Sequence, residues 1–251
     1  SRKSFESVLS YKHSFIPGKH EISISGSYSK TKGNRPADYY IEGQLLQKSS
    51  GGGAPTNAAI QADYTRTFFS SGKLEAGLKG FTRWNSFKYN FFNLDTITNE
   101  WILEPAFSND LDHRENIYSG YAMYSDSLFT KYFFKIGARL EFSTSELIQR
   151  SVTDTVSKKY LFPFPYLLIK RNLNKNQSIA FSFNSRITRP TYPQLNPYIN
   201  VIDETTYETG NKNLDPERLY KMELNYSFLK EKIKFTANLY GSATSDFITQ
   251  V

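Results

Sequence analysis

Apolar and polar residues alternate with a period of two along most of this chain, which is the pattern of β-strands whose two faces meet different surroundings. The clearest example lies at 131–142, where one face is apolar and the other is polar or charged apart from Phe133. The apolar face consists of Tyr132, Phe134, Ile136, Ala138, Leu140 and Phe142. A run of this length matches the ~9–11 residues of a tilted strand that crosses a bilayer.

The alternation predicts ten strands in all, joined in pairs by short turns. We place these turns near residues 17, 70, 126, 172 and 230. Long connections separate the pairs, and we expect loops at 30–56, 86–110, 143–159 and 187–217. In an antiparallel sheet all short turns then lie at one end and all long loops at the other, which is the asymmetry of outer-membrane β-barrels. Soluble Greek-key sandwiches give no reason for this regularity.

We therefore expect one all-β domain over residues 1–251, an antiparallel transmembrane β-barrel segment with short turns in the periplasm and long loops outside the cell. The strand at 161–169 is expected to be irregular, because Pro163 and Pro165 interrupt it. Aromatic residues near the strand ends agree with the aromatic girdles of such barrels. No segment is long and apolar enough for a transmembrane helix, and no signal peptide opens the chain.

Composition narrows the function. The net charge is +7, but Lys and Arg are scattered along the strands, which argues against nucleic-acid binding. The chain has no Cys, which excludes a thiol nucleophile and a Cys-based metal site. The most metal-like string is Asp110-Leu-Asp112-His113, and we interpret it as a solvated entry to a strand. No catalytic motif is present, so we expect no enzyme, no cofactor and no metal.

The connection at 187–217 is the most distinctive stretch. Its prolines remove backbone donors and favour extended geometry, so no helix or central strand is expected across 189–216. Three strings between Arg186 and Glu217 stand in one order: Arg-Ile-Thr-Arg-Pro, Leu-Asn-Pro and Gly-Asn-x-x-Leu-x-Pro-Glu. Their distinctive residues are Arg186, Arg189, Pro190, Leu195, Asn196, Pro197, Gly210, Asn211, Leu214, Pro216 and Glu217.

This wording resembles the TonB-dependent receptors, most closely their Bacteroidetes-type outer-membrane β-barrel branch. A second match is the hairpin in which a tyrosine-rich strand at 113–124 is followed by Gly-x-Arg-x-Glu at 137–141. The resemblance implies active import of a scarce solute across the outer membrane of a Gram-negative cell. It also implies a barrel of about twenty-two strands around a plug. No plug or coupling box occurs in this sequence, so the chain resembles an internal piece of such a barrel.

The partners implied are outer-membrane lipid, a plug domain and the rest of the barrel outside this chain, and a TonB-type coupling protein acting through the plug. The resemblance also implies a possible surface lipoprotein and an unknown solute as partners. Because sheet edges cannot stay unpaired in hydrocarbon, the first and tenth strands should pair with protein outside residues 1–251. The alternative function is that of a passive outer-membrane pore or of a structural and adhesion barrel. A soluble β-sandwich is the third possibility that remains open.

Solute contacts are expected from the long loops, where aromatic rings and guanidinium groups suit ligand binding. The candidate ligand-binding residues are Trp101, Arg189, Tyr192, Tyr198 and Tyr207. The alternative is a structural loop, in which Pro190, Leu195, Pro197 and Leu214 hold the segment folded on itself.

Overall fold

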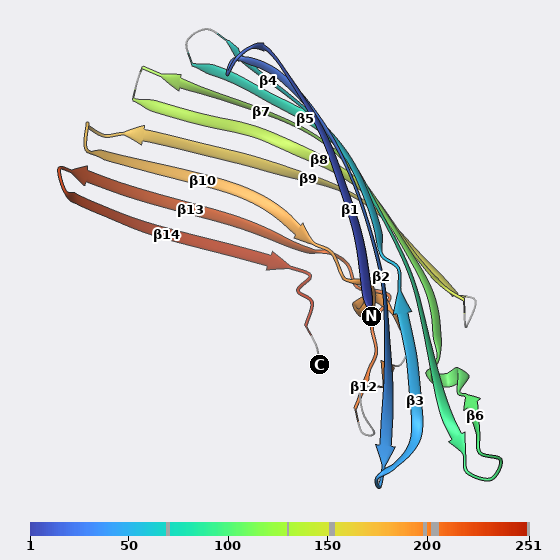
Figure 1. The fold of residues 1–251 in the computed structure, drawn as a ribbon. Helices are drawn as coiled ribbons and strands as arrows, with labels where there is room; N and C mark the ends of the chain where they lie inside the picture. Colours follow the sequence, from blue (N-terminus) through green and yellow to red (C-terminus); the bar gives the residue numbers. More distant parts are fainter. Residues whose placement is uncertain (69–70, 130, 151–153, 198–199, 202–205, 250–251) are drawn as a thin grey trace.

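The computed structural model describes residues 1–68, 71–129, 131–150, 154–197, 200–201 and 206–249. They form one antiparallel sheet of twelve strands and a separate pair of very short strands. Figure 1 shows the large sheet as a single twisted and curved layer. Short turns gather at one end of it, as the sequence predicts, and long hairpins extend from the other end.

Ten strands follow each other in chain order across the sheet, which confirms the ten predicted strands. Each is antiparallel to the next. They are β1 (Arg2–Ile16), β2 (His20–Ile41), β4 (Thr56–Phe68), β5 (Gly72–Asp95), β7 (Asn109–Leu128), β8 (Tyr132–Gln149), β9 (Asp154–Asn172), β10 (Gln177–Thr188), β13 (Glu217–Lys230) and β14 (Ile233–Ser245).

Three of the four predicted loops are wrong, because the strands continue through them. The 30–56 region is a hairpin of β2 with β3 (Gln44–Gly53), turning at Glu42 and Gly43. The 86–110 region holds the end of β5, β6 (Glu100–Leu103) and the 3-10 turn η1 (Pro105–Phe107). Most of 143–159 belongs to β8 and β9. Beyond the bilayer both faces of a strand meet polar surroundings, so the alternation ends while backbone pairing continues.

The expectation that 161–169 is irregular is also wrong. β9 pairs with β8 without a register shift, with Pro163 opposite Leu140 and Pro165 opposite Ala138. Prolines in a sheet are tolerated where a strand has an unpaired edge, because no neighbouring strand needs a backbone donor there. The ladder of β9 with β10 ends at Tyr166, so Pro163 and Pro165 have no β10 residue opposite them.

The sheet has two chemically different faces, because residues paired in register share a face. The outer face presents large apolar side chains such as Leu78, Leu140 and Leu161, which are 69%, 53% and 61% exposed. The opposite face, here called the lumen face, carries polar and charged residues such as Lys135 and Glu141. A single layer with an apolar outer surface excludes a soluble sandwich, whose apolar faces pack against each other.

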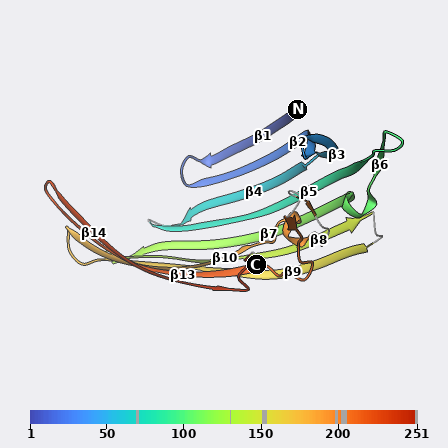
Figure 2. The same ribbon diagram turned by 90° about the horizontal axis from the view of Figure 1, so that it is seen from below.

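The sheet does not close on itself within the described residues. β1 and β14 stand at its two ends and each pairs with one neighbour only. Figure 2 shows them far apart on the curved sheet. None of the described helices has the length and apolar character needed to cross a membrane.

Candidate functional site

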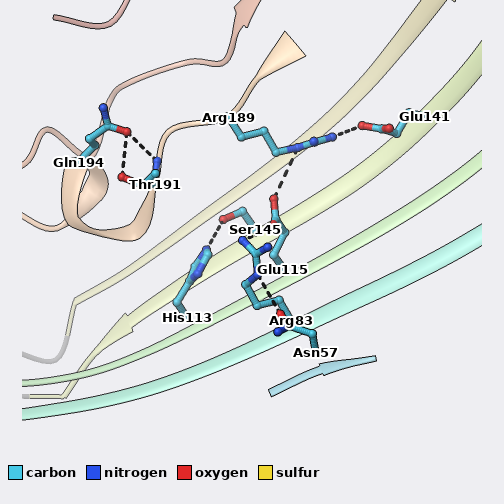
Figure 3. A network of polar contacts seen from close by, with 9 residues as sticks. All are labelled: Asn57, Arg83, His113, Glu115, Glu141, Ser145, Arg189, Thr191 and Gln194. Carbon is cyan, nitrogen blue, oxygen red and sulfur yellow. Dashed lines mark hydrogen bonds and ion pairs between the residues drawn. The ribbon is translucent and has the colours of Figure 1, made fainter. Parts of the chain in front are cut away.

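The described residues between β10 and β13, at 189–197, 200–201 and 206–216, fold onto the lumen face, and they are called the docked segment below. It begins with a single helical turn, α1 (Tyr192–Leu195), which corrects the expectation that no helix forms here. The turn tolerates Pro193 because the first turn of a helix has no intrahelical use for that N–H. The Gln194 side chain accepts hydrogen bonds from the backbone N–H (2.8 Å) and the hydroxyl (2.9 Å) of Thr191 (Figure 3).

The two ends of the docked segment join each other through backbone hydrogen bonds. Gly210 N–H donates to Asn196 O, and Asn211 N–H donates to Gln194 O, each over 2.7 Å. A Cβ at Gly210 would lie 2.5 Å from Gln194 O and 2.6 Å from Asn196 O, so only glycine fits this approach. Between these ends lies the pair β11 (Asn200–Val201) and β12 (Tyr207–Glu208). The Leu-Asn-Pro and Gly-Asn strings are therefore two halves of one structure.

Apolar packing holds the docked segment against the sheet. Leu195 is 6% exposed and packs with Leu111 of β7 and Leu147 of β8, which are 1% and 2% exposed. Tyr192 and Leu214 pack against the same cluster. Burying one leucine side chain contributes roughly 1.5–3 kcal/mol. This arrangement agrees with the alternative of a segment folded on itself.

An ion-pair network holds the docked segment as well (Figure 3). Arg189 forms ion pairs with Glu141 of β8 and, through Nε at 3.5 Å, with Glu115 of β7. Arg83 lies 3.5 Å from Glu115, and Arg139 lies 3.5 Å from Glu141. Glu115 and Glu141 are 7% and 4% exposed, respectively. Removing one partner of such a buried ion pair destabilises the protein, because the remaining charge stays buried without compensation.

His113 of β7 lies beneath the docked segment, beyond the apolar band of the sheet. Its Nε2 hydrogen-bonds to Ser145 Oγ over 3.1 Å. Burial lowers the pKa of His113 below its usual value of 6.5, and the nearby Arg83 charge lowers it further. Its Nδ1 and the Oγ of Ser143 are buried without a protein partner among the described residues. Both residues line a small, partly open cavity of about 20 Å³, which is room for one water molecule.

The end of the docked segment is fixed by β9. Lys158 Nζ donates to Leu214 O and forms an ion pair with Asp215 over 3.2 Å. The Tyr160 hydroxyl also donates to Asp215 over 3.2 Å. Pro216 is fully buried, so the residues before β13 are held on the sheet from several sides.

A larger cavity of about 700 Å³ lies beside the docked segment, at the end of the sheet with the long hairpins. It is called the mouth cavity here. Its lining includes the rings of Phe87, Tyr89 and Tyr192 and the run Gly51–Gly53. The rings of Phe87 and Tyr192 are 6.2 Å apart. Ligand pockets commonly have about this volume and combine apolar walls with a few polar groups.

The structure separates the predicted ligand-binding residues. Tyr192 lines the mouth cavity. Trp101 pairs with Leu94, an odd number of positions from Phe87 along β5, so it lies on the outer face, where Lys48 covers its ring at 4.0 Å.

The other predicted ligand-binding residues are spread along the docked segment. Arg189 is occupied by its two carboxylates, and Tyr207 is 60% exposed on β12. Tyr198 lies outside the described residues. A ligand contact for any of these residues stays a prediction.

Gly51–Gly53 lie within the loop predicted at 30–56, and no contribution of theirs to a site was predicted. The available signal was the neighbouring Phe-x-Tyr string at 87–89, whose rings cover glycines on the adjacent strand. A Cβ at Gly51 would lie 2.9 Å from the ring of Tyr89, so the ring lies directly over the glycine. Aromatic side chains stabilise glycines in strands in this way.

The fold and its faces define a class, the wall of an outer-membrane β-barrel. The sequence matches the family described as "Outer membrane protein beta-barrel family" over residues 13–251, and the chain belongs to this family. The protein is therefore an outer-membrane β-barrel protein, as the sequence predicts. No curated protein sequence matches the chain.

Solved structures with the same fold include transporters and import receptors. The chain is similar to the copper transporter OprC (TM-score 0.69, 12% identity), covering 98% of this chain and 39% of that one. It is similar to the ferric-catecholate import receptor Fiu from E. coli K12 (0.68, 11%), covering 97% and 41%. It is also similar to the ferric yersiniabactin uptake receptor FyuA from Yersinia pestis (0.65, 12%), covering 98% and 36%.

The chain thus spans about two fifths or less of the length of these structures. The predicted resemblance to TonB-dependent receptors is confirmed at the level of the fold.

Proposed function

We propose that this chain forms part of the wall of an outer-membrane receptor that imports a scarce solute with TonB-type energy coupling. The observation that carries the proposal is the mouth cavity, a ligand-sized space on the lumen face at the end with the long hairpins. Solutes that arrive from outside the cell meet this end of a barrel first. The similar structures are described as a copper transporter, an import receptor and an uptake receptor, which supports the same class of function.

The partners follow from this proposal. A plug domain fills the lumen, further strands pair with β1 and β14, and a TonB-type protein in the periplasm acts on the plug. Outer-membrane lipid covers the apolar outer face, and a surface lipoprotein can cap the outer end. The unknown solute binds between the mouth cavity and the plug.

Within this proposal the docked segment acts mainly as a scaffold. Its buried leucines and the ion pairs of Arg189 fix α1 on the sheet, and α1 carries Tyr192 to the edge of the mouth cavity. The segment therefore sets the position of one predicted ligand contact, while its own residues bind mostly to the sheet.

Conductance and crosslinking together test the proposal against a passive pore or a structural barrel. The full-length protein that contains this chain is purified from the outer membrane and inserted into planar lipid bilayers. A plugged, energy-coupled receptor gives no steady ion current, and in living cells it crosslinks to a TonB-type protein. A stable open conductance with no crosslink in energised cells identifies a passive pore, and the absence of both current and crosslink identifies a structural barrel. Either result overturns the proposal.

A further inference from the structure

The mouth cavity has an ordered floor that follows from the register of four strands. Arg35 of β2 pairs with Gly51 of β3, and Gly51 pairs with Tyr89 of β5. Residues paired in register lie on one face of a sheet. This first row therefore presents a cation, a bare backbone and an aromatic ring in that order.

A second row runs beside the first with the same order. Arg2 of β1 pairs with Gly33, Gly33 pairs with Gly53, and Gly53 pairs with Phe87. Neighbouring strands are about 4.8 Å apart, so the backbones of cation and ring are separated by roughly 10 Å in the first row and roughly 14 Å in the second. A solute with one flat ring and an attached charged group is of a size to reach from the cations to the rings.

The charge of the mouth cavity is one-sided. Arg2 and Arg35 both line it, and no described residue forms an ion pair with either. Its lining contains no Asp or Glu. Guanidinium groups bind carboxylates and phosphates through paired hydrogen bonds, and here both groups are free to do so.

The opposite side of the mouth cavity is aromatic and uncharged. Burial, supported by a hydrogen bond with Tyr39 and opposed by one with Ser49, raises the pKa of Tyr89 to about 12. The phenol therefore stays neutral and adds no negative charge. The rings of Phe87 and Tyr192, inclined at 42°, form the remaining wall. Aromatic rings bind flat or apolar groups by stacking and by edge contacts.

We propose that the mouth cavity binds an anionic solute that carries a flat ring. The anionic group lies at Arg35 and Arg2, the ring lies against Phe87, Tyr89 and Tyr192, and the glycines between them let the solute approach the backbone. This inference names the chemical class of the solute and rests on the proposed function for its biological setting. The chemistry of two cations facing three rings across glycine is the same whatever drives import.

Equilibrium binding to the purified full-length protein tests the proposal without any energy coupling. The probes are naphthalene-2-carboxylate and the neutral naphthalene-2-carboxamide, which share a ring and differ in charge. We expect the carboxylate to bind roughly tenfold or more tightly than the carboxamide. Arg35→Gln should weaken carboxylate binding by about the same factor and leave carboxamide binding unchanged.

A matched control keeps the charge change and moves it to the other face. Lys32 lies three positions from Arg35 in β2, an odd number that places it on the outer face. Lys32→Gln should not alter binding of either probe, and Arg35→Lys should restore part of the carboxylate preference. Heat-modifiable migration on gels confirms that each variant forms the barrel.

Three results overturn the inference: equal affinity of the two probes, no carboxylate binding at millimolar concentration, or equal losses from Arg35→Gln and Lys32→Gln. Any of them leaves the proposed import function standing, since the conductance and crosslinking tests use no ligand. Conversely, an open conductance together with an intact preference for the carboxylate overturns the proposed import function and leaves this inference standing.

Discussion

Truncating Leu195 to alanine should loosen the docked segment without unfolding the barrel. The side chain is 6% exposed and packs with Leu111 and Leu147, so its removal leaves a cavity that the rigid strands cannot fill. Buried Leu→Ala changes cost about 2–5 kcal/mol. The cost falls on the docked equilibrium of this segment, because the strands beneath it keep their backbone ladders.

Hydrogen exchange measures this change at two reporter amides. Gly210 and Asn211 donate to Asn196 O and Gln194 O, bonds that break when the segment opens. A loss of about 2–5 kcal/mol speeds exchange at both amides by roughly 30-fold to several thousand-fold.

A matched control is Leu103→Ala in β6, where the leucine is 45% exposed. It should leave exchange at Gly210 and Asn211 unchanged. If Leu195→Ala leaves exchange at these amides as slow as in the unmodified protein, the segment is not held by this cluster and the reasoning is refuted.

Three further predictions concern the membrane face, the glycine junction and pH. Ile136→Arg on the outer face should cost ~2–4 kcal/mol of barrel stability near the bilayer midplane, whereas Ser25→Arg on the lumen face should be tolerated; equal costs in urea unfolding from lipid vesicles would contradict the assignment of the faces. Gly210→Ala should expose the docked segment to limited proteolysis, because the new Cβ meets backbone oxygens of α1, while Gly241→Ala, whose Cβ meets nothing within 4 Å, should not. The pKa of His113 is lowered when the segment is docked, so the undocked state takes up a proton more readily. Docking should therefore be unaffected above pH 6.5 and should weaken as the pH falls below that value. His113→Gln should remove most of this pH dependence when hydrogen exchange of the docked segment is followed from about pH 7.5 to 5.5.

The ion-pair network of the docked segment could not be derived from sequence. Arg189 was expected to be free for a ligand, but the structure brings it to Glu115 and Glu141 on two neighbouring strands. Its nearest partner in sequence, Glu141, is 48 residues away, and a carboxylate on a polar face gives no sign of what covers it. Only the path of the docked segment across the lumen face decides this contact.

The same holds for the mouth cavity. The run Gly51–Gly53 looks like a flexible loop in sequence, because a strand outside the bilayer needs no apolar face and shows no alternation. Its pairing with β2 and β5 turns these glycines into the floor of a cavity with Arg35 on one side and Tyr89 on the other.

The sequence by itself determined the membrane-spanning part of this protein. Lipid on one side and polar surroundings on the other impose a period of two on every strand, so the apolar face at Tyr132–Phe142, the ten strands and the short turns were all legible in it. Tertiary structure alone decided the position of the docked segment on the lumen face and the formation of the mouth cavity at the end with the long hairpins. There, backbone pairing and buried polar contacts between distant residues replace the hydrophobic pattern, and such contacts depend on three-dimensional register that local sequence does not encode.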